Sequence, residues 1–227
     1  STLSSSSAAS DVYKRQGYRY SDIDFLLLQE VLEHSYRRGL DTLFSERIAA
    51  PLGLTRLCYR PLQHFGPKEM AEGQRDNFLR HQTLRGDVDD EAAAMLGGVS
   101  GNAGLFGNAE SCAVVCQMLL DDGRYGGRTL IDAKTIRHYT TYRHRPSPYA
   151  LGFDRQRGGG RGNTCEEAPM STYGHTGFTG TCFWIDPANQ IVYIFLSNRV
   201  APQRWNRKLS SLNIRTRIQS VIYDALP

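Results

Sequence analysis

The stretch GHTGFTGT, residues 174–181, places a histidine, a hydroxyl and glycines where they could do chemistry. The segment that follows, CFWIDPANQIVYIFLSN, predicts a strand, a turn and a second strand. On such a hairpin His175 can transfer a proton or carry charge, Thr176 can hydrogen-bond a ligand, and Gly177 leaves room for one beside the backbone. The plainer interpretation is that His175 is a strand-edge residue that makes only structural hydrogen bonds.

The sequence offers no nucleophile that would complement His175. There is no Ser-x-x-Lys, because no serine lies three positions before any of the four lysines, which are Lys14, Lys68, Lys134 and Lys208. The G-x-S-x-G and H-E-x-x-H motifs are also absent from the sequence. No metal site and no cofactor are expected, and a nucleophile facing His175 would have to lie outside this sequence.

The overall composition fits one globular domain or most of a larger one. The 227 residues are 40% hydrophobic and 22% charged, and no apolar run approaches the roughly 20 residues that a membrane-spanning helix needs. The net charge of +4 comes from scattered Lys and Arg without a face of stacking aromatics, which argues against a nucleic-acid partner. The five cysteines are expected to be mostly free or buried thiols, with at most one disulfide.

Residues 1–16, STLSSSSAASDVYKRQ, differ in character from the remainder of the chain. They are polar and of low complexity, they lack the apolar core of a signal peptide, and they are expected to be disordered. The part SSAASDVYKRQ resembles the in-frame translation of a common sequencing-library adapter. We therefore treat residues 1–16 as an adapter-derived scar and residues 17–227 as the genuine domain. The natural chain is expected to have more sequence before Gly17.

Helical periodicity predicts several helices from residue 21 onward. The first is expected at 21–39, with Ser21 as N-cap, Asp24 completing a capping box and Gly39 ending it. Its apolar residues fall on one side and make it amphipathic; they are Ile23, Leu27, Leu28, Val31 and Leu32. Further helices are expected at 41–49, from the N-cap Asn108 to 121–123, from near Asp132, and at 206–226.

The hairpin is predicted to contain strands at 178–185 and 190–197, joined by a turn at 187–189. The IVYIFL part of the second strand is apolar on both faces, so it is expected inside a sheet with a layer on each side. The last helix is expected to cover one face of this sheet, while residues 56–95 give no clear pattern. Helices and an antiparallel hairpin without βαβ alternation predict an α+β fold, an antiparallel β-sheet flanked by helices.

Four stretches, in this order, resemble the β-lactamase-related serine hydrolases, a family that includes class C β-lactamases, D-alanyl-D-alanine carboxypeptidases and esterases. They are YSD at 20–22, PLGLT at 51–55, GNAGLFGNAESCAVVCQMLLDDGRYGGRTL at 101–130, and GHTGFTG at 174–180 with its hairpin. The resemblance implies a β-lactamase/transpeptidase-like fold, of which residues 17–227 are the C-terminal two-thirds, incomplete at the N-terminus. More narrowly, the chain resembles the module fused behind family-three glycoside hydrolases in Bacteroidetes-type proteins.

In that family the serine of Ser-x-x-Lys attacks a carbonyl and forms an acyl-enzyme. The resemblance implies that Tyr20 transfers the proton and that His175 presents a polar or cationic group toward this tyrosine and a substrate carboxylate. It further implies that Thr176 hydrogen-bonds substrate, that Gly177 lets substrate lie against the strand, and that the Phe178 N–H is an oxyanion donor.

Three residues depart from the family's pattern. The second motif usually ends in Asn, whose amide can donate a hydrogen bond, whereas an ionised Asp22 can only accept. This difference weakens the case for substrate contact at Asp22 and for β-lactam hydrolysis. Asp89 and Asn102 stand where close relatives are expected to have His.

The leading hypothesis is a serine acyl-transfer hydrolase that acts on peptide, amide or ester bonds of a small molecule or a cell-wall peptide. This chain would be a fragment without its nucleophile, catalytically silent, and prone to aggregate because an unpaired sheet edge and part of the core are exposed. Its partner would be the missing N-terminal part of its own domain, and the resemblance implies a periplasmic or envelope location. The alternative is a non-catalytic accessory module of a glycoside hydrolase parent of the β-N-acetylhexosaminidase type.

Overall fold

The computed structural model describes residues 18–143 and 147–227. The segment interpreted as an adapter-derived scar, with its boundary at residue 16, lies outside these residues. The helices are α2 (Ile23–Tyr36), α3 (Leu40–Phe44), α4 (Glu91–Met95), α5 (Ala109–Leu120), α6 (Ala133–Thr141), α7 (Lys208–Ser211) and α8 (Ile214–Asp224), with a π-helical turn η1 (Ser45–Ala49) and 3₁₀ turns η2 (Pro61–Gln63) and η3 (Pro67–Glu69). Within the described residues, no helix has the length and apolarity that crossing a membrane requires.

The strands are short and fall into several sheets. They are β1 (Leu57–Tyr59), β2 (Glu72–Asp76), β3 (Gln82–Arg85), β4 (Leu105–Gly107), β5 (Arg124–Tyr125), β6 (Arg128–Thr129), β7 (Asp154–Arg155), β8 (Tyr173–Thr176), β9 (Cys182–Asp186) and β10 (Ile191–Phe195). β1 pairs with β4, β2 with β3, and β5 with β6, and each of these three pairs is a small antiparallel sheet.

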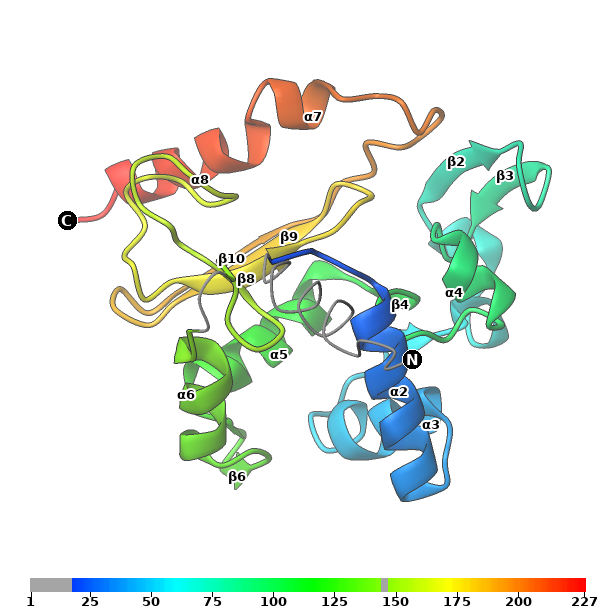
Figure 1. Cartoon of the computed structure of the whole chain (residues 1–227), viewed down its shortest axis with the longest axis horizontal. Helices are drawn as coiled ribbons and strands as arrows, with labels where there is room; N and C mark the ends of the chain where they lie inside the picture. The colour runs from blue at the N-terminus through cyan, green and yellow to red at the C-terminus, as the bar shows by residue number, and fades with distance from the viewer. Residues whose placement is uncertain (1–17, 144–146) are drawn as a thin grey trace, which may run out of the picture.

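The largest sheet carries His175 and is made by the last third of the chain. Its strand order is β10-β9-β8-β7, and every neighbouring pair is antiparallel. β9 and β10 form the predicted hairpin, in which Ile191 lies opposite Asp186, while His175 on β8 lies opposite Phe183 on β9. This antiparallel sheet with its flanking helices confirms the α+β fold expected from the sequence (Figure 1).

Helices cover both faces of this sheet, with α5 on one side and α7 and α8 on the other (Figure 1). On the α5 side Cys116 packs against Ile185 in a buried cluster. On the opposite face Trp184 and its cross-strand partner Tyr193 are buried together, and the Tyr193 hydroxyl donates to the Arg215 carbonyl oxygen of α8 at 3.0 Å. The prediction that the end of the chain covers one face of the sheet is therefore confirmed.

One prediction about this sheet is wrong. The sequence places the apolar strand β10 inside the sheet, but β10 is an edge strand of the sheet that the described residues form. Its residues are apolar because helices cover both of its faces, and this does not require a neighbouring strand on each side. The outer edge of β10 pairs with no other described strand, so backbone N–H and C=O groups on that side are open to hydrogen bonding.

Two predicted boundaries also differ from the structure. β9 begins at Cys182 rather than at residue 178, because residues 177–181 form a turn in which the Gly177 N–H donates to the Thr181 carbonyl oxygen at 2.8 Å. The single helix predicted at 206–226 is divided into α7 and α8 at Asn213, whose φ of 51° is left-handed. Asparagine is one of the few residues that adopt this backbone conformation readily, so it can separate two helices.

Helices whose start is set by a cap are close to their predicted positions. The Asn108 side chain accepts from the Ser111 N–H at 2.9 Å and begins α5, and Asp132 accepts from the Thr135 N–H at 2.9 Å and begins α6. The helix predicted at 41–49 is present as α3 followed by the π-helical turn η1. All five cysteines are free thiols, as the sequence mainly predicted, and no disulfide links them.

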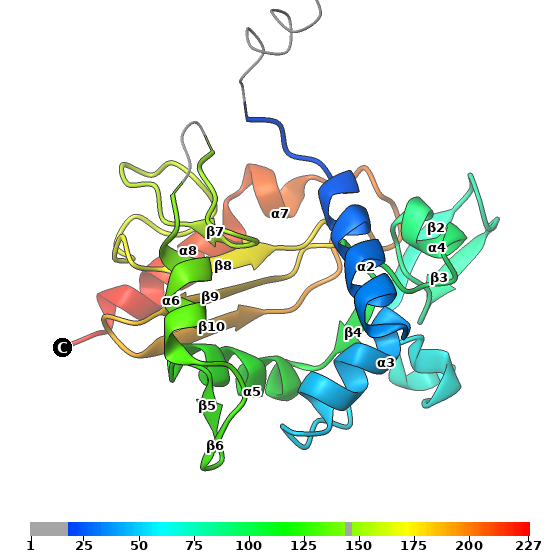
Figure 2. The same ribbon diagram turned by 60° about the horizontal axis from the view of Figure 1, so that its bottom comes forward.

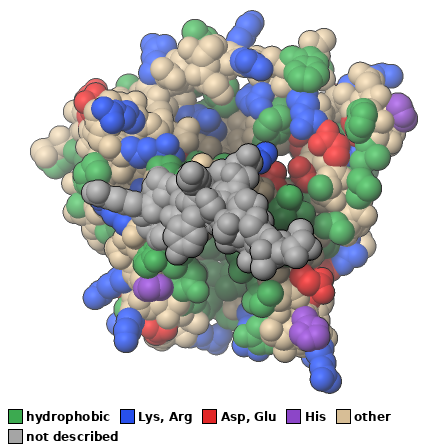
Figure 3. All heavy atoms as spheres, in the orientation of Figure 1, with side chains coloured by type: hydrophobic (Ala, Val, Ile, Leu, Met, Phe, Trp, Pro, Cys, Tyr) green, Lys and Arg blue, Asp and Glu red, His purple; other side chains and the backbone are tan. Residues whose placement is uncertain are grey.

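α2 forms where the sequence predicts a helix, yet its predicted apolar side is not buried. The helix begins at Ile23, one residue later than predicted, and it ends where Arg37 adopts a left-handed conformation rather than at Gly39. No residue of α2 is buried, and the five apolar residues of its predicted face are 41–62% exposed. Figure 3 shows several groups of hydrophobic side chains on this face of the molecule. The helix thus presents a large apolar surface that the rest of the described chain does not cover.

The segment without a clear sequence pattern folds around a charged anchor at the end of β2. The Asp76 carboxylate accepts hydrogen bonds from the Phe78 and Leu79 N–H groups at 2.9 and 3.0 Å, and from the Arg80 guanidinium at 2.7 Å. These donors, the Leu79 N–H first among them, hold the pKa of Asp76 well below its usual range although burial opposes them. A buried, ionised carboxylate therefore organises the β2–β3 hairpin.

Candidate active site

Two of the predicted site residues, far apart in the sequence, lie close together in the structure. Tyr20 is in the segment that leads into α2, and His175 is in β8 of the large sheet. Their ring centroids are 6.3 Å apart, with the ring planes tilted by 31°. Figure 2 shows the segment before α2 passing the sheet on the side of β8. The phenol and the imidazole therefore meet in one place.

The position of His175 also fixes which nitrogen carries the proton. Its Nδ1 lies 2.8 Å from the Thr176 carbonyl oxygen, and a carbonyl oxygen can only accept a hydrogen bond. Nδ1 must therefore carry the hydrogen, which leaves Nε2 as the acceptor whenever the ring is neutral. The residue is half-buried in a strand that pairs with β9, so the ring is held on a rigid part of the sheet.

Tyr20 has the chemistry of a proton donor in this environment. Burial raises the pKa of the Tyr20 phenol, and the nearby Asp22, Tyr149 and Asp154 raise it further. All of these influences disfavour the phenolate, so at neutral pH Tyr20 is a neutral phenol that can donate a hydrogen bond. To act as a base it would need a cation close to its oxygen, which is the role of a lysine in a Ser-x-x-Lys helix.

Two further rings, which the sequence did not indicate, complete the cluster. The ring centroid of Tyr149 is 5.8 Å from that of Tyr20, 6.1 Å from that of His175, and 5.3 Å from that of Tyr18, on which it stacks. We call Tyr18, Tyr20, Tyr149 and His175 the tyrosine–histidine cluster. Tyr149 precedes β7 in a loop without a recognisable motif, so only its aromatic type could have suggested a role.

The tyrosine–histidine cluster is anchored from behind by an ion pair. The Arg157 guanidinium lies over the Tyr149 ring, 5.1 Å from its centroid, and donates to the Asp154 carboxylate at 2.7 Å. Asp154 is buried and also accepts from the Asn163 amide at 2.7 Å. A guanidinium over an aromatic face is attractive, and its attachment to a buried carboxylate limits its motion. Tyr149 is therefore held toward His175 by β7 and the loop after it.

The residues after His175 form the turn that leads into β9. A side chain at Gly177 would place its Cβ 2.2 Å from Thr181 Oγ1, so a larger residue here would require the Thr181 hydroxyl to move. Phe178 has an exposed side chain, and its N–H donates no hydrogen bond to another described residue. The Phe178 N–H is thus free for an acceptor, as an oxyanion donor must be. Thr176 is half-buried on β8 beside His175.

The three residues that depart from the family pattern lie in different surroundings. Asp22 is exposed at the start of α2, where its carbonyl oxygen accepts from the Phe25 N–H at 3.0 Å. Asp89 comes just before α4, where burial raises the pKa of its carboxyl group. The Asn102 side-chain oxygen accepts from the Ser100 hydroxyl at 2.6 Å. None of these three belongs to the tyrosine–histidine cluster.

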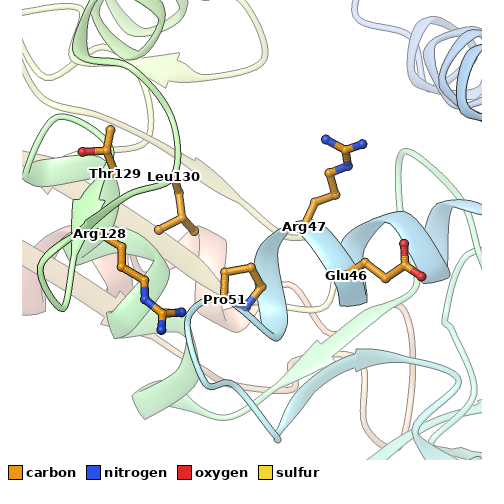
Figure 4. Close-up of a pocket in the computed structure, with 6 residues that line it drawn as sticks. All are labelled: Glu46, Arg47, Pro51, Arg128, Thr129 and Leu130. Carbon is orange, nitrogen blue, oxygen red and sulfur yellow. The ribbon is translucent and has the colours of Figure 1, made fainter.

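A surface hollow elsewhere in the molecule does not suit chemistry. It has a volume of about 490 Å³ and is lined by Glu46, Arg47, Pro51, Arg128, Thr129 and Leu130. Figure 4 shows Glu46 and Arg47 pointing away from the β5–β6 side, with Leu130 directed toward Pro51. Glu46 is already paired with Arg38 at 2.5 Å. A smaller hollow of about 420 Å³ adjoins Phe178. In the part of the chain that the structure describes, no group of three His, Cys, Asp or Glu side chains is placed to hold a metal ion.

The sequence of the chain matches the model of a known protein family. Residues 7–212 match the Beta-lactamase family, so this chain belongs to the β-lactamase-like serine hydrolases. The match begins within the segment interpreted from sequence as a scar, whose origin stays a prediction.

Two curated relatives carry the name of a carboxypeptidase. An Escherichia coli K12 protein named "Putative D-alanyl-D-alanine carboxypeptidase" is 38% identical over 196 residues, which are 79% of this chain and 44% of that protein. A Salmonella enteritidis protein of the same name is 36% identical over 79% of this chain and 45% of its own length. The chain therefore spans less than half the length of the curated relatives it matches.

Solved structures share the fold at low sequence identity. A β-lactamase from Mycobacterium bovis has a TM-score of 0.60 at 19% identity, over 90% of this chain and 63% of that one. EstCE1, a hydrolase with promiscuous acyltransferase activity, has a TM-score of 0.62 at 18% identity, over 90% of this chain and 56% of its own. These likenesses support the fold and do not by themselves identify a substrate.

Proposed function

We propose that this chain is the portion of a serine acyl-transfer hydrolase that supplies the proton-transfer wall of the active site. The reaction would be hydrolysis of a peptide, amide or ester bond through an acyl-enzyme. The observation that carries the proposal is the 6.3 Å approach of the Tyr20 and His175 rings, which come from opposite ends of the chain. A structural role for His175 alone would not require a phenol from another element beside it.

Each residue of the site would then have a definite task. Tyr20 donates a proton to the leaving group, and in the presence of a neighbouring cation it accepts one from the attacking hydroxyl. His175, with Nδ1 tied to the Thr176 carbonyl oxygen, accepts or donates through Nε2. The Phe178 N–H stabilises the oxyanion, a contribution that is typically worth about 10²- to 10³-fold in rate. Gly177 keeps the strand edge open for substrate, with Thr176 and Asp22 as candidate contacts.

The nucleophile would be supplied by an N-terminal part of the domain that this sequence does not contain. Three observations support this proposal: the sequence has no Ser-x-x-Lys, the outer edge of β10 pairs with no described strand, and the apolar side of α2 is exposed. A segment that added a strand to β10 and packed against α2 would cover both surfaces. The chain alone would then be inactive.

The substrate class proposed is a small or cell-wall peptide that ends in D-alanine, acted on in the periplasm or cell envelope. The support is the name shared by bacterial relatives that are 36–38% identical to this chain. Asp22 in place of the usual asparagine favours a peptide or ester over a β-lactam, because an ionised carboxylate cannot donate a hydrogen bond to the substrate.

A second candidate is a non-catalytic accessory module of a glycoside hydrolase parent. The observation that favours it is the absence of any Ser-x-x-Lys in the sequence. The two candidates differ in what lies upstream of residue 17 at the source locus. A Ser-x-x-Lys encoded there supports the hydrolase, whereas a glycosidase domain without that motif supports the accessory module.

Covalent labelling of the protein extended by its upstream sequence tests the function directly. A fluorophosphonate or fluorescent penicillin should label the serine of the upstream motif, and Tyr20→Phe should slow labelling by about 10²- to 10⁴-fold because a positioned proton-transfer group is lost. Tyr139→Phe, on the exposed side of α6, is the matched control and should label at the parent rate. Equal rates for Tyr20→Phe and Tyr139→Phe would refute the proposal.

A further inference from the structure

A second hollow adjoins the candidate active site at the turn that follows Gly177. Its volume is about 420 Å³, and its lining residues are Phe178, Arg199, Arg204, Trp205, Arg207 and Ser210. We call it the arginine–tryptophan pocket. Because the turn of residues 177–181 joins β8 to β9, the pocket is at the end of the strand that carries His175. The pocket therefore shares Phe178 with the candidate active site.

Two large aromatic side chains of this pocket are left in contact with water. Trp205 is 79% exposed and Phe178 is 53% exposed, although most aromatic side chains of this size are largely buried. The guanidinium groups of Arg199 and Arg204 lie over the Phe178 ring, 4.5 and 4.9 Å from its centroid. Phe178 is thus held in place by cation–π contacts, while Trp205 offers a free flat surface.

The lining of the pocket is positively charged, and two of its three arginines have partners among the described residues. Arg199 donates to the Phe178 and Asn206 carbonyl oxygens at 2.8 and 3.0 Å, and Arg204 forms an ion pair with Glu91. Arg207 forms no ion pair with another described residue. The residues that line the pocket include no carboxylate, and Glu91 is already paired with Arg204. An exposed guanidinium beside a free aromatic face suits a ligand that carries both a flat ring and an anion.

We propose that the arginine–tryptophan pocket binds ring-bearing carboxylates, with the ring on Trp205 and the carboxylate on Arg207. Arginine binds carboxylates through paired N–H donors, and an aromatic face beside it adds selectivity for a flat group. The assignment of this ligand to the substrate of the acyl-transfer site rests on the proposed function. The binding itself needs no nucleophile, so it can succeed or fail independently.

Tryptophan fluorescence of the 227-residue chain tests this inference, because the two tryptophans differ so strongly in exposure. Trp184 is only 1% exposed, so a ligand added to the solvent acts on Trp205. Titration with benzoate should change the emission in a saturable way. Benzamide, which has the ring without the charge, and acetate, which has the charge without the ring, should each bind at least tenfold more weakly. Added NaCl should weaken benzoate binding, because the carboxylate meets an exposed arginine.

Variants at exposed positions locate the site without disturbing the fold. Arg207→Gln should weaken benzoate binding by about 10- to 100-fold, which is the loss of a charge-assisted hydrogen bond. Arg217→Gln removes the same charge from the exposed side of α8 and should leave binding unchanged. Trp205→Phe should abolish the fluorescence response while calorimetry still detects binding. Equal affinities for benzoate and benzamide, or equal weakening by Arg207→Gln and Arg217→Gln, would overturn the proposal.

Discussion

The two main residues of the candidate site, His175 and Tyr20, are positioned by elements that differ strongly in burial. His175 is on a strand whose neighbour β9 carries Trp184 and Ile185, which are 1% and 0% exposed. Tyr20 precedes a helix with no buried residue, on which Val31 is 60% exposed. The imidazole is therefore positioned by a packed sheet inside this chain, whereas the phenol depends on a helix that is mostly uncovered.

A few polar contacts attach α2 to the rest of the molecule. The Gln29 side chain accepts from the Gly101 N–H at 2.9 Å and donates to the Val99 carbonyl oxygen at 3.3 Å. A Cβ at Gly101 would lie 2.2 Å from the Phe25 carbonyl oxygen, so the helix backbone approaches this loop closely. The His175 half of the site is thus stabilised by apolar burial, whereas the helix that follows Tyr20 is attached mainly through polar contacts such as those of Gln29.

The largest expected loss of stability comes from a substitution in the packed sheet that carries His175. Ile185→Ala should lower the free energy of unfolding by about 4 kcal/mol, because it removes a fully buried side chain and leaves a cavity. Val31→Ala on α2 is the matched control and should change it by less than about 0.5 kcal/mol, since that side chain is already in water. Urea unfolding followed by circular dichroism measures the free energy of unfolding of both variants. Similar losses for the two would contradict the view that the sheet is packed and α2 is not.

The buried carboxylate of Asp76, outside the sheet that carries His175, should contribute nearly as much to the free energy of unfolding. The pKa of Asp76 is lowered in the folded protein, so its contribution is present above the unfolded pKa of about 3.9 and is lost as the pH falls below it. Asp76→Asn should lose about 3 kcal/mol at pH 7 because the mostly buried Arg80 is left unpaired. The variant should also show a smaller fall in stability between pH 5 and 2 in a series of urea titrations. An unchanged acid limb would mean that Asp76 is not ionised in the folded protein.

The close approach at Gly101 gives a smaller effect that separates the two walls. Gly101→Ala should cost about 2 kcal/mol, because the added methyl group collides with the Phe25 carbonyl oxygen and moves α2. The movement should weaken the contact between Tyr20 and His175 while the sheet stays intact. Nuclear Overhauser effects between these two rings should decrease, and those between Trp184 and Tyr193 should persist. Loss of both sets together would show that α2 and the sheet form one packed unit.

The smallest effect on folding concerns the exposed side of α2. The double variant Leu27→Lys/Val31→Lys should alter the free energy of unfolding by less than about 0.5 kcal/mol while reducing self-association, because it breaks up an apolar surface. Light scattering and size-exclusion chromatography compare it with the unaltered chain. Glu30→Lys, on the same helix but outside the apolar side, controls for the added charge. A monodisperse parent chain would contradict the expected aggregation.

The features that the sequence predicted well are those decided by neighbouring residues. Asn108 and Asp132 begin helices because each side chain reaches an N–H three residues away, an interaction that is visible in the sequence. The meeting of Tyr20 with His175 was expected from the resemblance to the family, since no periodicity links such distant positions. The break at Asn213 could have been anticipated, because asparagine tolerates the left-handed backbone that separates α7 from α8.

The features that were missed depend on the path of the chain in space. Tyr149 and Arg157 lie in loops around β7 whose residue types carry no motif, and only the course of those loops brings them to His175. β10 was expected inside the sheet because its sequence is apolar on both faces. An apolar run indicates that both faces of a strand are covered, but it does not indicate whether a strand pairs with each edge. An exposed part of the core was expected, but its location on α2 was not, since the apolar pattern of a helix does not reveal whether a partner is present.

Arg199 connects the turn after β8 to the segment before α7 through hydrogen bonds. Its side chain donates to the carbonyl oxygens of Phe178, Arg204 and Asn206, and its own N–H donates to that of Thr179 at 2.8 Å. A displacement of either segment is therefore expected to displace the other, because the guanidinium of Arg199 is bonded to both. The Phe178 carbonyl group is therefore coupled through Arg199 to the loop that carries Trp205.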